Sequence, residues 1–173
     1  MTREALPPEV VKVLEERAER LRAHGKVEEE TELVLTAEFA VGDELFAFPL
    51  ERLRGVVPLS RVTRVPLSAP EILGVVRFHG QLVTSMSLPA LLGGRAWTAD
   101  PSVLLVAEPT PGVLVGIDCE QVPRPGALAR RLVEDARSAA GEAPWLEVQL
   151  GGGRQLNLLV LERLLARREV DHG

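Results

Sequence analysis

Several residue types are scarce in this sequence. It contains one cysteine, Cys119, no tyrosine, and only 3% aromatic residues. A single cysteine excludes an intramolecular disulfide framework and is typical of a reducing compartment. Few aromatic rings and a net charge of −5, with acids and bases interspersed, argue against the stacking platform and the basic face of nucleic-acid-binding proteins. We therefore expect no direct nucleic-acid partner.

Long apolar runs are also missing. No stretch approaches the roughly 20 apolar residues that span a bilayer, and the N-terminal MTREALPPEVV lacks the apolar core of a secretory signal. We therefore expect a cytoplasmic protein without membrane insertion. The 173 residues, of which 46% are hydrophobic, suffice for one packed domain and one added element.

The added element is an amphipathic helix predicted over residues 7–24. Pro7 and Pro8 suit its first turn, and Gly25 supplies a stop. One narrow apolar stripe recurs at helical spacing, formed by Val10, Leu14, Ala18 and Leu21. The stripe packs on the rest of its own chain or binds a partner or a second copy. A charged connector follows, so we divide the chain into residues 1–31 and a β-rich domain over residues 32–173.

Short strands separated by turn residues dominate from residue 32 onward. Gly42, Gly80 and Gly112 each stand where a pair of alternating segments reverses. The expected strands are residues 32–41, 44–48, 55–57, 73–78, 81–87, 102–108, 113–118, 144–150 and 155–160. Short helical segments are expected at 87–92 and 161–169. Many short strands at close spacing favour small barrels over a parallel α/β sheet.

The sequence contains few candidates for chemistry. The histidines are scattered, the zinc motifs HExxH and CxxC are missing, and residues 151–154 lack the Lys-Ser/Thr ending of a phosphate loop. We expect neither metal nor cofactor. Cys119 and His79 form the one imaginable thiol and base, but Asp118 and Glu120 flank the thiol and would raise its pKa. A thiol enzyme and a small-barrel nucleic-acid binder remain as alternatives.

The stretch from Phe39 to Leu92 resembles the CheW-like family. The residues in register with the family's hairpins and proline segment are Phe39, Gly42, Thr63, Pro66, Pro70, Gly74, Val75, Gly80, Val83 and Leu88. Asp118 and Val122 resemble a later strand, and LNLLVLERLL resembles the closing strand and helix. The resemblance covers about residues 33–166.

This resemblance implies a mainly β fold of two intertwined five-stranded SH3-like barrels, here with an added N-terminal helix and a short C-terminal one. It implies a non-enzymatic scaffold in bacterial chemosensory signalling, clustered with receptor arrays and without a cofactor. The implied partners are the signalling domain of a chemoreceptor and the regulatory domain of a CheA-type histidine kinase. The implied receptor groove is lined by Leu53, Val56, Val76, Phe78 and Met86, with His79 at its rim.

Some positions depart from the family pattern. The family's Asn-Leu-Arg-Gly is Arg77-Phe78-His79-Gly80 here, and its Pro-Val-x-Asp runs from Thr84 to Ser87. Gly55 replaces a usual acid. Histidine does not reproduce the fixed charge and planar donors of arginine, so kinase contacts at these positions are in doubt. The chain is either an ordinary receptor-kinase coupling protein or an adaptor with weakened kinase binding that tunes the array.

Overall fold

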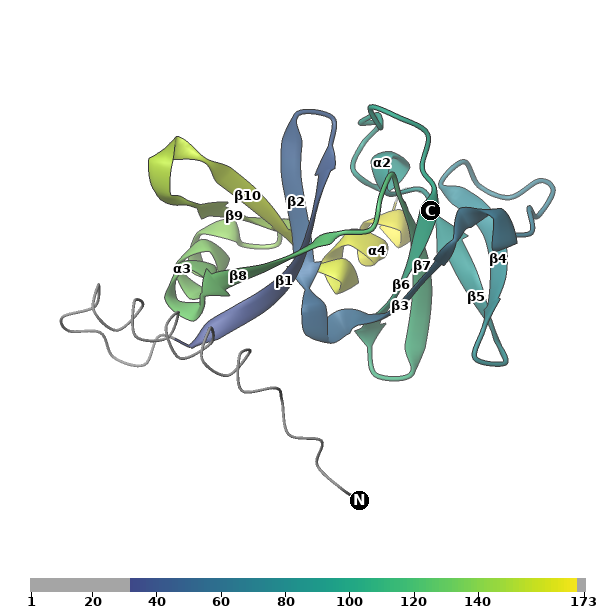
Figure 1. The fold of residues 1–173 in the computed structure, drawn as a ribbon, viewed down its shortest axis with the longest axis horizontal. Helices are drawn as coiled ribbons and strands as arrows, with labels where there is room; N and C mark the ends of the chain where they lie inside the picture. Colours follow the sequence, from purple (N-terminus) through teal and green to yellow (C-terminus); the bar gives the residue numbers. More distant parts are fainter. Residues whose placement is uncertain (1–31, 171–173) are drawn as a thin grey trace, which may run out of the picture. The chain divides into compact units, whose positions relative to one another are not determined.

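The computed structural model describes residues 32–170, and the side chains of residues 32–166 (Figure 1). The helix predicted over residues 7–24 lies outside the described residues. It stays a prediction, as does the division of the chain at residue 31. No helix among the described residues is long and apolar enough to cross a membrane.

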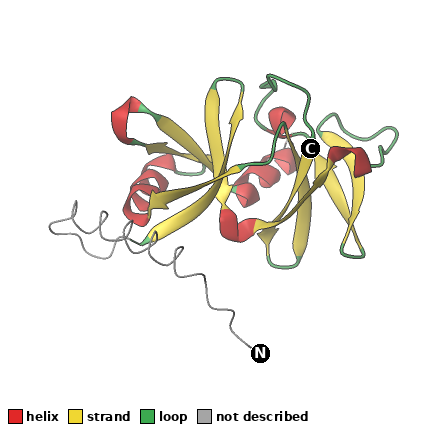
Figure 2. Ribbon diagram, in the orientation of Figure 1, coloured by secondary structure: helices red, strands yellow, loops and turns green. Residues whose placement is uncertain are grey.

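Ten strands form two five-stranded sheets (Figure 2). Sheet A has the order β8-β1-β2-β10-β9, with β1 (Leu33–Val41), β2 (Glu44–Pro49), β8 (Arg124–Ala129), β9 (Trp145–Gln149) and β10 (Gln155–Leu159). Sheet B has the order β3-β6-β7-β5-β4, with β3 (Leu53–Pro58), β4 (Ile72–Phe78), β5 (Gln81–Met86), β6 (Val103–Thr110) and β7 (Val113–Cys119). The predicted mainly β fold with two five-stranded units is confirmed.

The two sheets share one plan. Each contains a single parallel pair, β10 with β2 in sheet A and β5 with β7 in sheet B, and its other neighbours are antiparallel. The chain leaves sheet A after β2 to add β3 to sheet B, and leaves sheet B after β7 to add β8 to sheet A. The first five strands therefore put two in sheet A and three in sheet B, and the last five do the reverse in the equivalent order.

Short helices connect these strands. The α-helices are α2 (Leu88–Leu91), α3 (Arg130–Ala140) and α4 (Leu161–Val170), and the 3-10 turns are η1 (Leu50–Arg52), η2 (Leu59–Arg61) and η3 (Gly151–Gly153). The short helices predicted at 87–92 and 161–169 correspond to α2 and α4. In each half a helix follows the parallel-paired strand, α2 after β5 and α4 after β10.

The sequence prediction missed β8 and α3. Pro125 and Gly126 are unfavourable in most strands, but β8 lies at the edge of sheet A, where the missing N–H of a proline is tolerated. The α3 segment does carry a helical signal, because Leu132, Val133 and Ala136 recur at helical spacing before Gly141 ends the helix.

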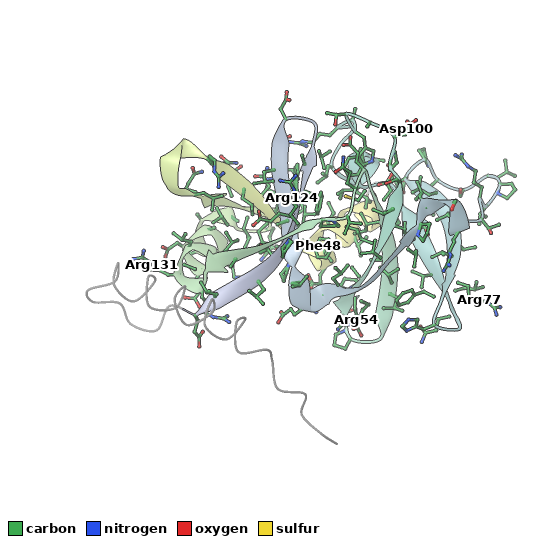
Figure 3. All side chains as sticks on the ribbon, in the orientation of Figure 1. Phe48, Arg54, Arg77, Asp100, Arg124 and Arg131 are labelled. Atoms are coloured by element: carbon green, nitrogen blue, oxygen red, sulfur yellow. The ribbon has the colours of Figure 1, made fainter. Side chains whose placement is uncertain are left out.

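Three apolar clusters hold the domain together. The largest lies between the sheets, where Phe46 and Phe48 of β2 meet Leu105 and Ile117 of sheet B and Leu164 of α4 (Figure 3). The second fills the inner face of sheet A, and Val133 of α3 closes it. The third fills the inner face of sheet B, where η2 and the following loop contribute only the half-buried Leu59 and Val62.

Candidate functional site

Three of the six residues predicted to line the receptor groove are core residues. Val76 and Met86 are each 2% exposed and Phe78 is 8% exposed. Val76 and Phe78 belong to the cluster inside sheet B, and Met86 belongs to the cluster between the sheets. Their apolar character therefore reflects packing within the domain, and little of these three side chains is open to a partner.

The other three predicted groove residues differ in their exposure and surroundings. Leu53 is half-buried against the cluster between the sheets, and Val56 is exposed further along β3. His79 is exposed in the β4–β5 turn, where its ring stacks on Phe78 with 4.1 Å between the ring centroids. Two of these three residues, Val56 and His79, therefore offer exposed surface.

A different apolar groove runs along the start of β1. The alternate residues Leu33, Leu35, Ala37, Phe39 and Val41 share one face of this strand. The last three are buried in the cluster between the sheets, whereas Leu33 is 56% exposed and Leu35 is 55% exposed. One apolar strand face therefore begins in solvent and ends in the core.

This groove measures about 740 Å³ and lies between β1, η1 and α3. Apolar groups of Leu50, Val133 and Leu158 line it beside the two exposed leucines. Its charged lining has both signs, with Glu51, Glu134, Arg130 and Arg137. An apolar floor with a mixed-charge rim suits an amphipathic helix better than a small polar ligand. The sequence signal for it was the unbroken apolar series on one face of β1.

Several of the predicted kinase-contact positions lie around the β4–β5 hairpin. Arg77 is paired with Leu82 and Val75 with Thr84, so these residues share the outer face of sheet B. Arg77, Leu82 and Thr84 are exposed, and His79 is exposed at the turn (Figure 3). Leu82 is 72% exposed, which makes it the apolar centre of this surface.

Gly55 differs from the other positions because a side chain there would disturb the core. A Cβ atom at Gly55 would lie 2.8 Å from the ring of Phe78. The glycine therefore admits this ring into the interior of sheet B. Because the Phe78 ring occupies this space, packing alone explains why position 55 carries no acidic side chain.

Ser87, the last of these positions, precedes α2 and is half-buried. Its backbone N–H donates to the carbonyl of Glu71 at 2.7 Å. The next residue, Leu88, donates its backbone N–H to the Asp118 carboxylate at 2.8 Å, and Trp97 Nε1 donates to the same group at 3.2 Å. Burial raises the pKa of Asp118 despite these donors. Asp118 anchors α2 and the loop after it to β7.

Cys119 cannot supply a reactive thiolate in the folded domain. It is 1% exposed, and burial, with the neighbouring carboxylates, raises its pKa to about 11. His79, its imagined base, is exposed in the β4–β5 turn, whereas Cys119 lies in the cluster between the sheets. Within residues 32–170, no group of three or more His, Cys, Asp or Glu residues is arranged to hold a metal ion.

Comparisons with known proteins agree with this architecture. The solved scaffolding protein TtCheW from Thermoanaerobacter tengcongensis superposes with a TM-score of 0.61 at 13% identity, over 80% of this chain and 93% of that protein. No curated protein matches the sequence significantly. The model of the CheW-like domain matches residues 36–169. The chain therefore belongs to the CheW-like family, the scaffold proteins of chemotaxis signalling.

Proposed function

We propose that this protein is a cytoplasmic, non-enzymatic adaptor that holds the helical signalling tip of a chemoreceptor in the β1 groove and clusters with the receptors. The observation that carries this proposal is the exposure of Leu33 and Leu35 on a strand face that is otherwise core. Its action by binding agrees with the burial of Cys119 and with the scaffold role of the family.

The energetics of the groove suit a reversible scaffold contact. Full burial of one leucine side chain contributes about 1.5–3 kcal/mol. Two leucines over an apolar floor therefore supply the few central anchors that dominate a helix-in-groove interface. Rim residues such as Glu51 and Arg130 add selectivity and association rate more than affinity.

We propose further that the outer face of sheet B is the surface for the kinase regulatory domain, and that it binds weakly. Leu82, which is paired with Arg77, and Val113 of β7 offer exposed apolar area on sheet B, while His79 lacks the fixed charge that the family's arginine has at this turn. A desolvated charge pair typically contributes about 2–5 kcal/mol, and its loss would weaken kinase binding strongly. An ordinary coupling role, with kinase binding retained, is the competing hypothesis.

Calorimetry with a purified receptor signalling domain tests the receptor site. Leu35→Asp should weaken binding at least tenfold, because it removes an anchor and places a carboxylate in an apolar contact. Leu82→Asp is the matched control, because it makes the same substitution at an exposed leucine of the other sheet. Equal receptor affinity of the Leu35→Asp variant and the wild type, with circular dichroism unchanged, would contradict the groove assignment.

The kinase surface is tested with the same two variants and the kinase regulatory domain. Leu82→Asp should weaken any kinase binding and leave receptor binding intact, and Leu35→Asp should do the opposite. His79→Arg should strengthen kinase binding by restoring a fixed cation at the turn. Tight kinase binding by the wild type, with no gain from His79→Arg, would favour the ordinary coupling role.

A further inference from the structure

Leu67 occupies a strained and unsupported position. It lies in the loop between η2 and β4, its backbone φ is +60°, and its relative exposure is 105%. The left-handed conformation is unfavourable for a branched aliphatic residue, and an exposed leucine gains nothing from burial. A strained residue without a folding role suggests a function in binding.

The loop around Leu67 is held in place at both ends. Thr63 and Val75 exchange backbone hydrogen bonds of 2.8 and 2.9 Å, and the N–H of Ile72 donates to the carbonyl of Ala69 at 2.9 Å. Within the loop the Ser68 hydroxyl donates to the carbonyl of Val65 at 2.9 Å. Pro66 and Pro70 restrict the backbone further. The loop therefore presents Leu67 in a fixed direction.

A pocket opens beside this loop. It measures about 450 Å³ and is lined by Leu59, Val62, Leu73 and Pro101, together with Ser60, Arg64 and Ser102. In sheet A the equivalent connection, between β8 and β9, is helix α3, and its Val133 closes the inner cluster. In sheet B the connection is η2 and the loop, which leave Leu59 and Val62 accessible at the equivalent place.

Charges of both signs stand at the pocket. Arg64 lines it, and Asp100, labelled in Figure 3, directly precedes the lining residue Pro101. Both are exposed, and the four ion pairs found within residues 32–170 involve other side chains. A two-fold contact would bring the cation of one molecule to the acid of the other.

We propose that this face binds a second copy of the chain, with Leu67 of each copy inserted into the sheet B pocket of the other. An apolar projection beside an apolar pocket satisfies the self-complementarity that a two-fold interface requires. The contact pairs Arg64 with the partner's Asp100 at two symmetric places. It leaves the β1 groove open, so it is independent of receptor binding.

Sedimentation velocity of the full chain over a concentration series tests this contact. The wild type should show a reversible monomer–dimer equilibrium. Leu67→Asn should weaken dimerisation roughly a hundredfold or more, because each dimer loses two buried leucines. Asparagine adopts positive φ at low cost, so the variant monomer should melt about 3 °C higher. Leu82→Asn, a matched change of another exposed leucine, should dimerise as the wild type does.

Charge reversal separates this face from any other site of self-association. Arg64→Asp and Asp100→Arg should each weaken the dimer, and the double variant should restore it. A wild type that stays monomeric at every concentration overturns the proposal. So does a dimer that Leu67→Asn leaves unchanged, which would place self-association elsewhere. A monomeric wild type whose kinase binding falls in Leu67→Asn also overturns it and assigns the leucine to that partner.

Discussion

The two halves of the domain have the same strand order but close their inner faces differently. In the second half, the chain between β8 and β9 forms α3, and Val133 seals the inner cluster of sheet A. In the first half, the chain between β3 and β4 forms η2 and the Leu67 loop, and the pocket beside them stays open. The two ends of one fold therefore offer different surfaces, a helix beside the β1 groove and a loop beside the sheet B pocket.

The sheets also differ at equivalent positions inside. Leu158 of β10 stands opposite Ala47 in the parallel pair of sheet A, and Ser85 of β5 stands opposite Gly116 in that of sheet B. Ser85 is in turn paired with Gly74 of β4. The small pair Ser85 and Gly74 thus stands in sheet B where sheet A has the large pair Leu158 and Leu146. The space admits Leu104 against Gly116 and the backbone of Thr63 against Gly74.

The largest difference in stability between the halves should appear when an aspartate replaces the valine that α3 or the η2 loop packs against the inner cluster. Val133→Asp should destabilise the domain by about 3–5 kcal/mol, because the side chain is 6% exposed and the charge would lie in the inner cluster. Val62→Asp, at the open end of sheet B, should cost about 1 kcal/mol or less, because the new charge can reach water. Urea unfolding measures both, and equal losses would contradict the comparison.

A smaller loss is expected where the Leu67 loop is attached to sheet B. Gly74 has a φ of +149°, and a Cβ there would overlap the carbonyl oxygen of Thr63. Gly74→Ala should therefore break the Thr63–Val75 bridge and cost about 2–3 kcal/mol. Gly80→Ala is the control, because its φ is also positive but open space surrounds it. If the two alanine variants unfold at the same urea concentration, the close approach of Thr63 does not matter.

The glycines and prolines of the first half can be read directly from the sequence. As turn residues, they explain why most strands could be predicted. Turn residues and alternation located nine of the ten strands, since these signals are local. The missed strand, β8, is held by pairing with β1 and carries no strand signal of its own. The groove predicted from the sequence included three core residues for a related reason. Apolar residues such as Val76 look alike in sequence whether a sheet covers them or not.

The stability that Asp118 contributes by linking α2 to β7 should depend on pH. Asp118 accepts from two N–H donors, and asparagine offers only one acceptor oxygen, so Asp118→Asn should cost about 1–2 kcal/mol. The folded-state pKa of Asp118 is raised by burial, so its contribution to stability is fully present below the unfolded pKa. That contribution is lost as the pH rises through the raised folded pKa.

Denaturation midpoints measured from acid to neutral pH should therefore show this contribution as the difference between the wild type and Asp118→Asn. The variant's deficit should accordingly be largest in acid and shrink toward neutral pH. A difference between wild type and variant that is constant across this range would mean that Asp118 titrates in the folded state as it does in the unfolded chain.

The smallest expected effect concerns buried hydroxyl groups in the two sheets. Ser85 is fully buried, and its Oγ has no hydrogen-bond partner within the described part of the chain. Ser85→Ala should therefore stabilise the domain by about 0.5–1 kcal/mol, because it removes an unsatisfied polar group and little volume.

Thr36 of sheet A is equally buried, but its hydroxyl donates to Glu38 at 3.0 Å. Thr36→Val should accordingly destabilise the domain, since Glu38 would lose this donor. The melting temperatures of the two variants should shift in opposite directions if the buried hydroxyl lacks a hydrogen bond in sheet B and has one in sheet A. A loss of stability in Ser85→Ala would show instead that the hydroxyl is satisfied, by water or by the rest of the chain.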